Sequence, residues 1–159
     1  MSTYQKIIDL LTQNKTNYKE LRHKPVVTSE EAFKARSDIS LSQGAKALIV
    51  RCKGRDKKNF FIMVILPGDK RFNSKKLKSL ISAPSITFAS EKEVFLITNG
   101  VLPGGVPPFG SIFNLKTYVD HSLLANSEIA FNAGDRSISI IMKTIDWLKL
   151  ENPQKTDII

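Results

Sequence analysis

The chain has 159 residues, enough for a sizeable hydrophobic core, and we expect residues 1–159 to form a single domain. Hydrophobic residues make up 42% and charged residues 25%, and 24 Lys and Arg against 15 Asp and Glu give a formal net charge of +9. The longest apolar run, Phe60–Leu66, is far shorter than the ~20 residues of a membrane span, and residues 1–6 lack a signal-peptide pattern. We therefore expect a cytoplasmic protein with no membrane partner. Cys52 is the only cysteine, which excludes an internal disulfide, and with two distant histidines we expect no metal and no cofactor.

Hydrophobic spacing and turn residues predict helices and strands along the whole chain. Helices are expected over residues 4–11, 28–36, 74–81, 90–100 and 144–150. Strands are expected over residues 18–23, 45–52, 59–66, 85–89, 116–119, 128–132 and 137–142. Hairpins link most of the strands, which favours a mixed α/β fold of the α+β type with a largely antiparallel sheet. We expect residues 151–159 to be a frayed tail.

Residues 103–110, Pro-Gly-Gly-Val-Pro-Pro-Phe-Gly, form the most unusual stretch. Three glycines and three prolines rule out a helix or a central strand and predict a stiff loop that exposes backbone N–H and C=O groups. The Asn132–Gly134 turn is a second candidate of this kind. Free N–H groups on such turns can bind an oxyanion, and a purely structural turn is the alternative.

Lys46 is the single charge in the apolar run 44–50. If its side chain points into a pocket, it is an electrostatic clamp for a phosphate or a developing oxyanion; otherwise it is a solvent-exposed strand residue. His23 is a candidate proton carrier, with a structural role as the alternative. Cys52 follows Arg51 but has no histidine nearby in the sequence, which favours an inert thiol.

The excess positive charge is concentrated in two stretches. The first contains Arg51, Lys53, Arg55, Lys57 and Lys58, and the second contains Lys70, Arg71, Lys75, Lys76 and Lys78. Clustered basic residues attract polyanions such as nucleic acids, and the alternative is a solvated face that aids solubility.

Several short motifs occur together in a specific order over residues 18–150. They are His23-Lys24-Pro25, Thr28–Ala32, Gln43–Leu48, Ala89-Ser90 with Glu93-Val94, Gly104–Gly110, Val119-Asp120 and Phe131–Gly134. With this ordered set the chain resembles the YbaK/prolyl-tRNA-synthetase-associated domain family of free-standing aminoacyl-tRNA editing proteins. Within that family it is most similar to the small bacterial YeaK-type branch.

The resemblance implies a mixed, mostly antiparallel curled sheet flanked by helices, and hydrolysis of the ester bond of mischarged aminoacyl-tRNA. It implies that Lys46, Gly104 and Gly134 are catalytic positions and that the substrate's own 2′-hydroxyl helps to activate water. Contacts to the substrate are then expected from His23, Thr28, Gly105, Val106, Pro107, Pro108, Phe109, Asn132 and Ala133.

On this reading the two basic stretches receive the tRNA acceptor end, and an aminoacyl-tRNA synthetase is a further candidate partner. We expect Val27, Ile62, Val64 and Phe109 to form the pocket walls and the amino acid to be small, like serine or threonine. Three alternatives remain open at this point, a non-catalytic tRNA-binding module of the same fold, a small-molecule esterase and a protein that only docks on a synthetase.

Overall fold

The strands form two sheets, and the computed structural model describes all residues from 1 to 159. The first sheet has the order β1 (Tyr18–Arg22), β7 (Ile138–Lys143), β6 (Glu128–Asn132). The second has the order β4 (Ser85–Phe88), β2 (Ala45–Lys53), β3 (Asn59–Pro67), β5 (Lys116–Asp120), β8 (Gln154–Thr156). All neighbouring strands are antiparallel except the β3–β5 and β5–β8 pairs.

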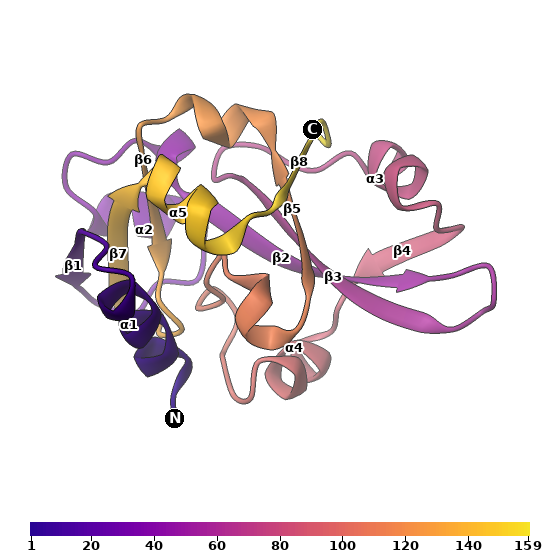
Figure 1. Cartoon of the computed structure of the whole chain (residues 1–159), viewed down its shortest axis with the longest axis horizontal. Helices are drawn as coiled ribbons and strands as arrows, with labels where there is room; N and C mark the ends of the chain where they lie inside the picture. The colour runs from indigo at the N-terminus through magenta and orange to yellow at the C-terminus, as the bar shows by residue number, and fades with distance from the viewer.

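Five α-helices lie around the sheets (Figure 1). They are α1 (Thr3–Gln13), α2 (Ser29–Ala35), α3 (Ser74–Ile81), α4 (Glu91–Ile97) and α5 (Thr144–Glu151). The hydroxyl of Thr28 caps α2 by accepting the Glu31 N–H at 3.1 Å, and Ser90 caps α4 in the same way through Glu93. No helix has the length and apolar character needed to cross a membrane.

The main hydrophobic core lies between the two sheets. Met63 and Ile65 of β3 face Ile129 and Ile140 of the three-stranded sheet, and Trp147 of α5 is fully buried with them. A second core covers the other face of the five-stranded sheet under α3. Because alternate side chains of a strand point to opposite faces, β3 has a continuous buried apolar run rather than an alternating pattern.

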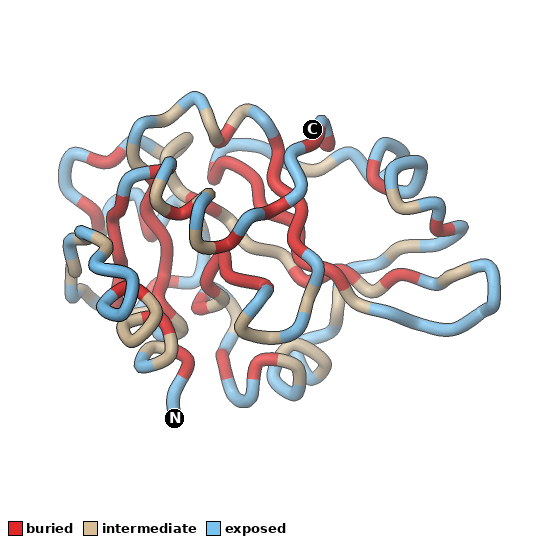
Figure 2. Tube along the Cα trace, viewed as in Figure 1, coloured by how far each residue is buried: buried red, intermediate tan, exposed pale blue.

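The start of β2 lies next to the middle of β6. Gly44, just before β2, forms an isolated bridge with Ala130 of β6, which joins the two sheets at this point. The opposite end of β2 continues into a long hairpin with β3, which projects to the right of the molecule in Figure 1 and is exposed at its tip in Figure 2. Lys46 lies near the first end of β2, and the basic residues Lys53, Arg55, Lys57 and Lys58 lie at the second.

The expected mixed, mostly antiparallel architecture flanked by helices is confirmed, although the strands are divided between two sheets. The prediction of a frayed tail over residues 151–159 is wrong. Glu151 ends α5, residues 154–156 form β8, and Ile158 is fully buried in the second core. The Ile158 N–H also donates a hydrogen bond to the Asp120 carboxylate at 2.8 Å. Burial of an apolar end residue and this hydrogen bond hold the tail in place.

Candidate active site

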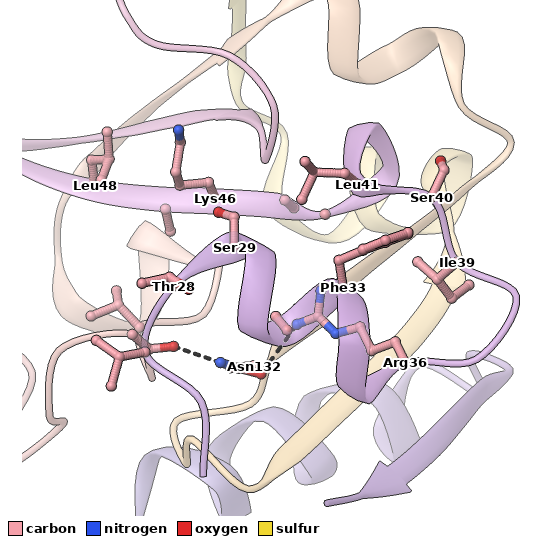
Figure 3. Close-up of a pocket in the computed structure, with 17 residues that line it drawn as sticks. Thr28, Ser29, Phe33, Arg36, Ile39, Ser40, Leu41, Lys46, Leu48 and Asn132 are labelled. Atoms are coloured by element: carbon pink, nitrogen blue, oxygen red, sulfur yellow. Dashed lines mark hydrogen bonds between the residues drawn. The ribbon is translucent and has the colours of Figure 1, made fainter. Parts of the chain in front are cut away.

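A cavity of about 250 Å³ opens between α2, the start of β2 and the Gly/Pro loop (Figure 3). It is smaller than the roughly 300–1,000 Å³ typical of ligand pockets, so it suits a small chemical group rather than a whole nucleotide. Its lining residues are Val27, Thr28, Ser29, Ala32, Phe33, Arg36, Ile39, Ser40, Leu41, Gly44, Ala45, Lys46, Ala47, Leu48, Gly104, Val106 and Asn132. The wall thus contains two cations and no carboxylate, imidazole or thiol.

Lys46 is the second residue of β2 and lies at one side of this cavity. Its side chain is half-buried, and Nζ donates a hydrogen bond to the backbone oxygen of Lys70 in the turn after β3. Burial lowers the pKa of Lys46, and the nearby Glu30 carboxylate acts in the opposite direction. In Figure 3 the Lys46 side chain points away from Arg36 and Asn132, which lie on the other side of β2.

Arg36, which the sequence analysis missed, is the second cation of the cavity. It follows α2 directly, and only 8% of its surface is exposed. Nε donates to Ser139 Oγ at 2.9 Å, and Nη2 donates to Asn132 Oδ1 at 3.1 Å. Burial lowers the pKa of Arg36 to about 10, so the guanidinium stays charged at neutral pH. The structure has three salt bridges, and none of them involves Arg36.

The Gly/Pro loop approaches the cavity at Gly104. This residue has φ +85°, and a side chain there would place Cβ 2.7 Å from the Val27 oxygen, so only glycine fits. The Gly104 oxygen accepts a hydrogen bond from Asn132 Nδ2 at 2.6 Å. The N–H groups of Gly104 and Val106 have no hydrogen-bond partner within the chain. The loop therefore has two unoccupied backbone donors at residues that line the cavity.

Gly105 and Gly134 use their N–H groups inside the fold. The Gly105 N–H donates to Leu102 at 3.0 Å, and the Gly134 N–H donates to the Gly105 oxygen at 2.9 Å. Gly134 has φ +82°, and a Cβ there would lie 2.7 Å from Thr3. Neither glycine lines the cavity. Gly134 therefore fixes the Gly/Pro loop against β6 and α1, and its N–H is not available to an oxyanion.

Several residues expected in the pocket belong to the core instead. Phe109 is fully buried and packs edge to face on Phe131, with 5.6 Å between the ring centroids. Pro107, Pro108 and Ala133 are also buried, and the Pro108 oxygen accepts the Trp147 indole N–H at 2.8 Å. These contacts anchor the loop whose other end reaches the cavity.

Ile62 and Val64 lie in the second core, on the face of β3 away from the cavity, so they are not pocket walls. Of the four wall residues expected from the sequence, only Val27 lines the cavity. Thr28, Val106 and Asn132, which the family resemblance implies as substrate contacts, do line the cavity.

His23 lies behind the cavity wall rather than in it. Its Nε2 is 2.7 Å from Ser139 Oγ, the same hydroxyl that binds Arg36 and contacts Asn132 Oδ1 at 3.2 Å. His23 thus stands at the outer end of a hydrogen-bonded chain that reaches the cavity through Ser139. This arrangement supports the wall and gives the imidazole no direct contact with the cavity.

The basic residues form two exposed groups at opposite ends of β2. Lys53, Arg55, Lys57 and Lys58 lie on the projecting hairpin. The first of them, Lys53, is about 23 Å from Lys46, because seven residues of extended strand separate the two at about 3.3 Å each. Lys70, Arg71 and Lys75 are exposed around the turn that contacts Lys46. Arg51 and Lys76 have acidic partners, Glu93 at 3.3 Å and Asp157 at 3.0 Å.

Comparison with known proteins identifies the class to which this fold and cavity belong. Residues 23–150 match the aminoacyl-tRNA editing domain family, and the chain belongs to this family. As a member it is an aminoacyl-tRNA deacylase, a hydrolase that removes wrong amino acids from tRNA. The family assignment made from the ordered sequence motifs is confirmed.

Particular relatives resemble the chain over most of its length. The multifunctional Ser/Thr-tRNA deacylase ProXp-y of Escherichia coli is 35% identical over 153 residues, which are 96% of this chain and 90% of that protein. A proline–tRNA ligase of Bacillus licheniformis is 35% identical over 117 residues, which are 72% of this chain but only 19% of that enzyme. The crystal structure of a candidate trans-editing enzyme for prolyl-tRNA synthetase has a TM-score of 0.80 with 23% identity, covering 99% of this chain and 97% of that one.

Proposed function

We propose that this deacylase removes serine and threonine from mischarged tRNA and that the reaction takes place in the cavity beside Gly104 and Arg36. The E. coli relative is named for the same two amino acids and is aligned over nearly the whole chain. The cavity of about 250 Å³ has room for a small acyl group, and its wall combines apolar side chains with the polar groups of Thr28, Ser29 and Asn132. A small, partly polar cavity suits a short hydroxyl-bearing side chain.

The composition of the cavity wall supports a mechanism without a protein general base. The wall offers cations, amides and hydroxyls but no side chain with a basic lone pair at neutral pH. The terminal ribose of tRNA brings its own 2′-hydroxyl next to the ester, which can orient and activate the attacking water. The protein then contributes orientation and charge stabilisation, and orientation alone can lower a barrier by ~7–11 kcal/mol.

Lys46 and the loop would hold the two sides of the substrate. Lys46, beside the exposed Lys70 and Arg71, is positioned for the phosphate of the terminal adenosine. The free N–H groups of Gly104 and Val106 would hold the ester or the attacking water on the other side. The acyl group then lies between them, within the cavity.

The two basic groups are the proposed surface for the tRNA acceptor stem. The group around Lys70 lies near Lys46, and the hairpin group begins about 23 Å farther along β2, so one helical arm of tRNA can contact both. Because a proline–tRNA ligase contains a similar domain, we also propose a synthetase as a partner that supplies the mischarged tRNA. We propose a cytoplasmic location because aminoacylation and translation take place there.

The test is deacylation of a panel of labelled aminoacyl-tRNAs that carry serine, threonine, alanine, proline or cysteine. The proposal predicts release of serine and threonine well above spontaneous hydrolysis. Preferential release of another amino acid would contradict the proposed substrate class. Normal tRNA binding without release of any amino acid would favour a non-catalytic binding module.

A further inference from the structure

The guanidinium of Arg36 has donors that the fold leaves unused. Nε and one N–H of Nη2 are bound by Ser139 and Asn132, whereas Nη1 has no hydrogen-bond partner in the chain. Every fully buried side-chain nitrogen or oxygen in the structure has a hydrogen-bond partner. Because Nη1 has none, it is not fully buried. A methyl group at Gly44 would be in ordinary van der Waals contact with Nη1, at 3.6 Å, so Gly44, which also lines the cavity, lies directly beside this end of the side chain. The unused N–H groups therefore open into the cavity that Arg36 lines.

A buried cation without a carboxylate is costly for a small domain. Removing a charge from water costs several kcal/mol unless a partner of opposite charge is present, and the cavity wall contains none. The lowered pKa of Arg36 reflects the same burial. Asn132 and Ser139 hold the guanidinium in one orientation but supply no negative charge. An anionic group on a bound substrate would supply the opposite charge.

Ester hydrolysis creates such a charge at one atom. When water attacks the carbonyl carbon, the carbonyl oxygen takes the electron pair of the broken π bond and becomes an oxyanion. Preorganised donors aimed at this oxygen lower the barrier because they are oriented before the reaction starts. Asn132 contacts both Arg36 and the Gly104 oxygen, so one amide group separates the guanidinium from the Gly/Pro loop.

We propose that Arg36 is a catalytic residue of this deacylase and that its free N–H groups bind the ester carbonyl oxygen as it becomes negative. The inference rests on the proposed function. As the tetrahedral intermediate collapses, the carbonyl re-forms and the bond from carbon to the ribose oxygen breaks. The ribose oxygen receives the proton lost by the attacking water, and free amino acid and tRNA leave.

Two other roles for Arg36 are less consistent with its position. The terminal phosphate is the usual partner of an arginine, but it is large and hydrated, and Arg36 is only 8% exposed at the wall of a small cavity. Lys46 lies nearer the exposed basic turn and is better placed for that phosphate. If Arg36 instead recognised the side-chain hydroxyl of the amino acid, its N–H groups would act as ordinary hydrogen-bond donors and its positive charge would have no anionic partner.

The experiment compares wild type with Arg36→Met in single-turnover hydrolysis of seryl-tRNA and alanyl-tRNA at saturating protein. Affinity for uncharged tRNA is measured by fluorescence anisotropy, and folding is checked by thermal melting. Lys34→Met is the matched control, because it removes an exposed cation from the same helix outside the cavity. Arg36→Lys, which keeps the charge but loses the planar fork, is the second variant if Arg36→Met does not fold.

The proposal predicts that Arg36→Met lowers the hydrolysis rate of both substrates by the same factor of ~100 or more, with tRNA affinity within twofold of wild type. Arg36→Lys should lose at least ~10-fold, and Lys34→Met should match wild type. A folded Arg36→Met with near-wild-type rates would overturn the proposal, as would a loss confined to seryl-tRNA or a loss of tRNA affinity alone. If wild type hydrolyses neither these nor other aminoacyl-tRNAs, the deacylase account fails and the role of Arg36 fails with it.

Discussion

Gly104 offers the sharpest test of the Gly/Pro loop, because the structure fixes what an added methyl group would meet. In Gly104→Ala the new Cβ would lie 2.7 Å from the Val27 oxygen and 2.8 Å from its Cα, at a φ of +85°. The positive φ costs ~1–2 kcal/mol for a residue with a Cβ. Overpacking against backbone typically costs a further ~1–3 kcal/mol. We therefore predict a loss of about 2–5 kcal/mol in the free energy of unfolding, or a displaced loop that relieves the strain.

Either result should also reduce activity, because the Gly104 oxygen is bound by Asn132 and the Gly104 N–H lies at the cavity. A displacement of about 1 Å at a reacting group can lower the rate on the order of 100-fold. Urea unfolding gives the stability, and single-turnover hydrolysis of seryl-tRNA gives the rate. Gly105→Ala is the milder comparison, since its φ is not positive and its Cβ would meet the Leu102 oxygen and the Val101 side chain at 3.2 Å, a tight contact but without the overlap at Gly104. Equal stability and equal rate in wild type and Gly104→Ala would refute this account of the loop.

Three further predictions concern the tRNA surface, the buried acid and the thiol. Lys53→Ala should reduce the slope of log tRNA affinity against log salt concentration by about 1. Arg51→Ala should reduce this slope less, because Arg51 is already paired with Glu93. Equal reductions in the two variants would argue against this distinction. Burial raises the pKa of Glu151, so the folded state binds this proton more tightly than the unfolded chain, and the contribution of Glu151 to stability falls as pH rises above about 4.5. As pH rises across the mildly acidic range, the free energy of unfolding of Glu151→Gln, measured by urea titration, should therefore fall less, or rise more, than that of wild type. The same dependence on pH in both proteins would contradict the assignment. Burial raises the pKa of Cys52 to about 11, so its thiol should resist alkylation until the protein unfolds and Cys52→Ala should keep near-wild-type turnover; rapid labelling of the native protein would contradict this.

The parts of the site that the sequence predicted are those with a local signal. Lys46 is recognisable as one charge in an apolar strand, and Gly104 lies in a run of glycines and prolines that allows no regular structure. The capping residues Thr28 and Ser90 likewise mark the starts of α2 and α4 within one residue. In each case the residues that determine the structure are close together in the sequence.

The remaining parts depend on contacts between distant segments. Arg36 looks like an ordinary cation at the end of a short polar helix, and only its contacts with Asn132 and Ser139, about a hundred residues away, hold it at the cavity. The sequence could not place Ile62 and Val64 on the correct face, since β3 is apolar throughout and periodicity cannot tell the two faces of such a strand apart. Residues 151–159 were expected to fray because chain ends are often poorly ordered, and the segments that hold them in place, β5 and the second core under α3, are remote in the sequence.

We propose that this protein hydrolyses aminoacyl-tRNA in a cavity where Lys46 is required. The most direct measurement is release of labelled serine from seryl-tRNA by wild type and by Lys46→Ala, with tRNA affinity measured in parallel. The account predicts rapid release by wild type and a rate at least ~100-fold lower for Lys46→Ala, the size expected for loss of one electrostatic contact to the reacting group or its phosphate. Wild-type turnover in Lys46→Ala would remove Lys46 from the mechanism, and absence of release by wild type would contradict the enzyme itself.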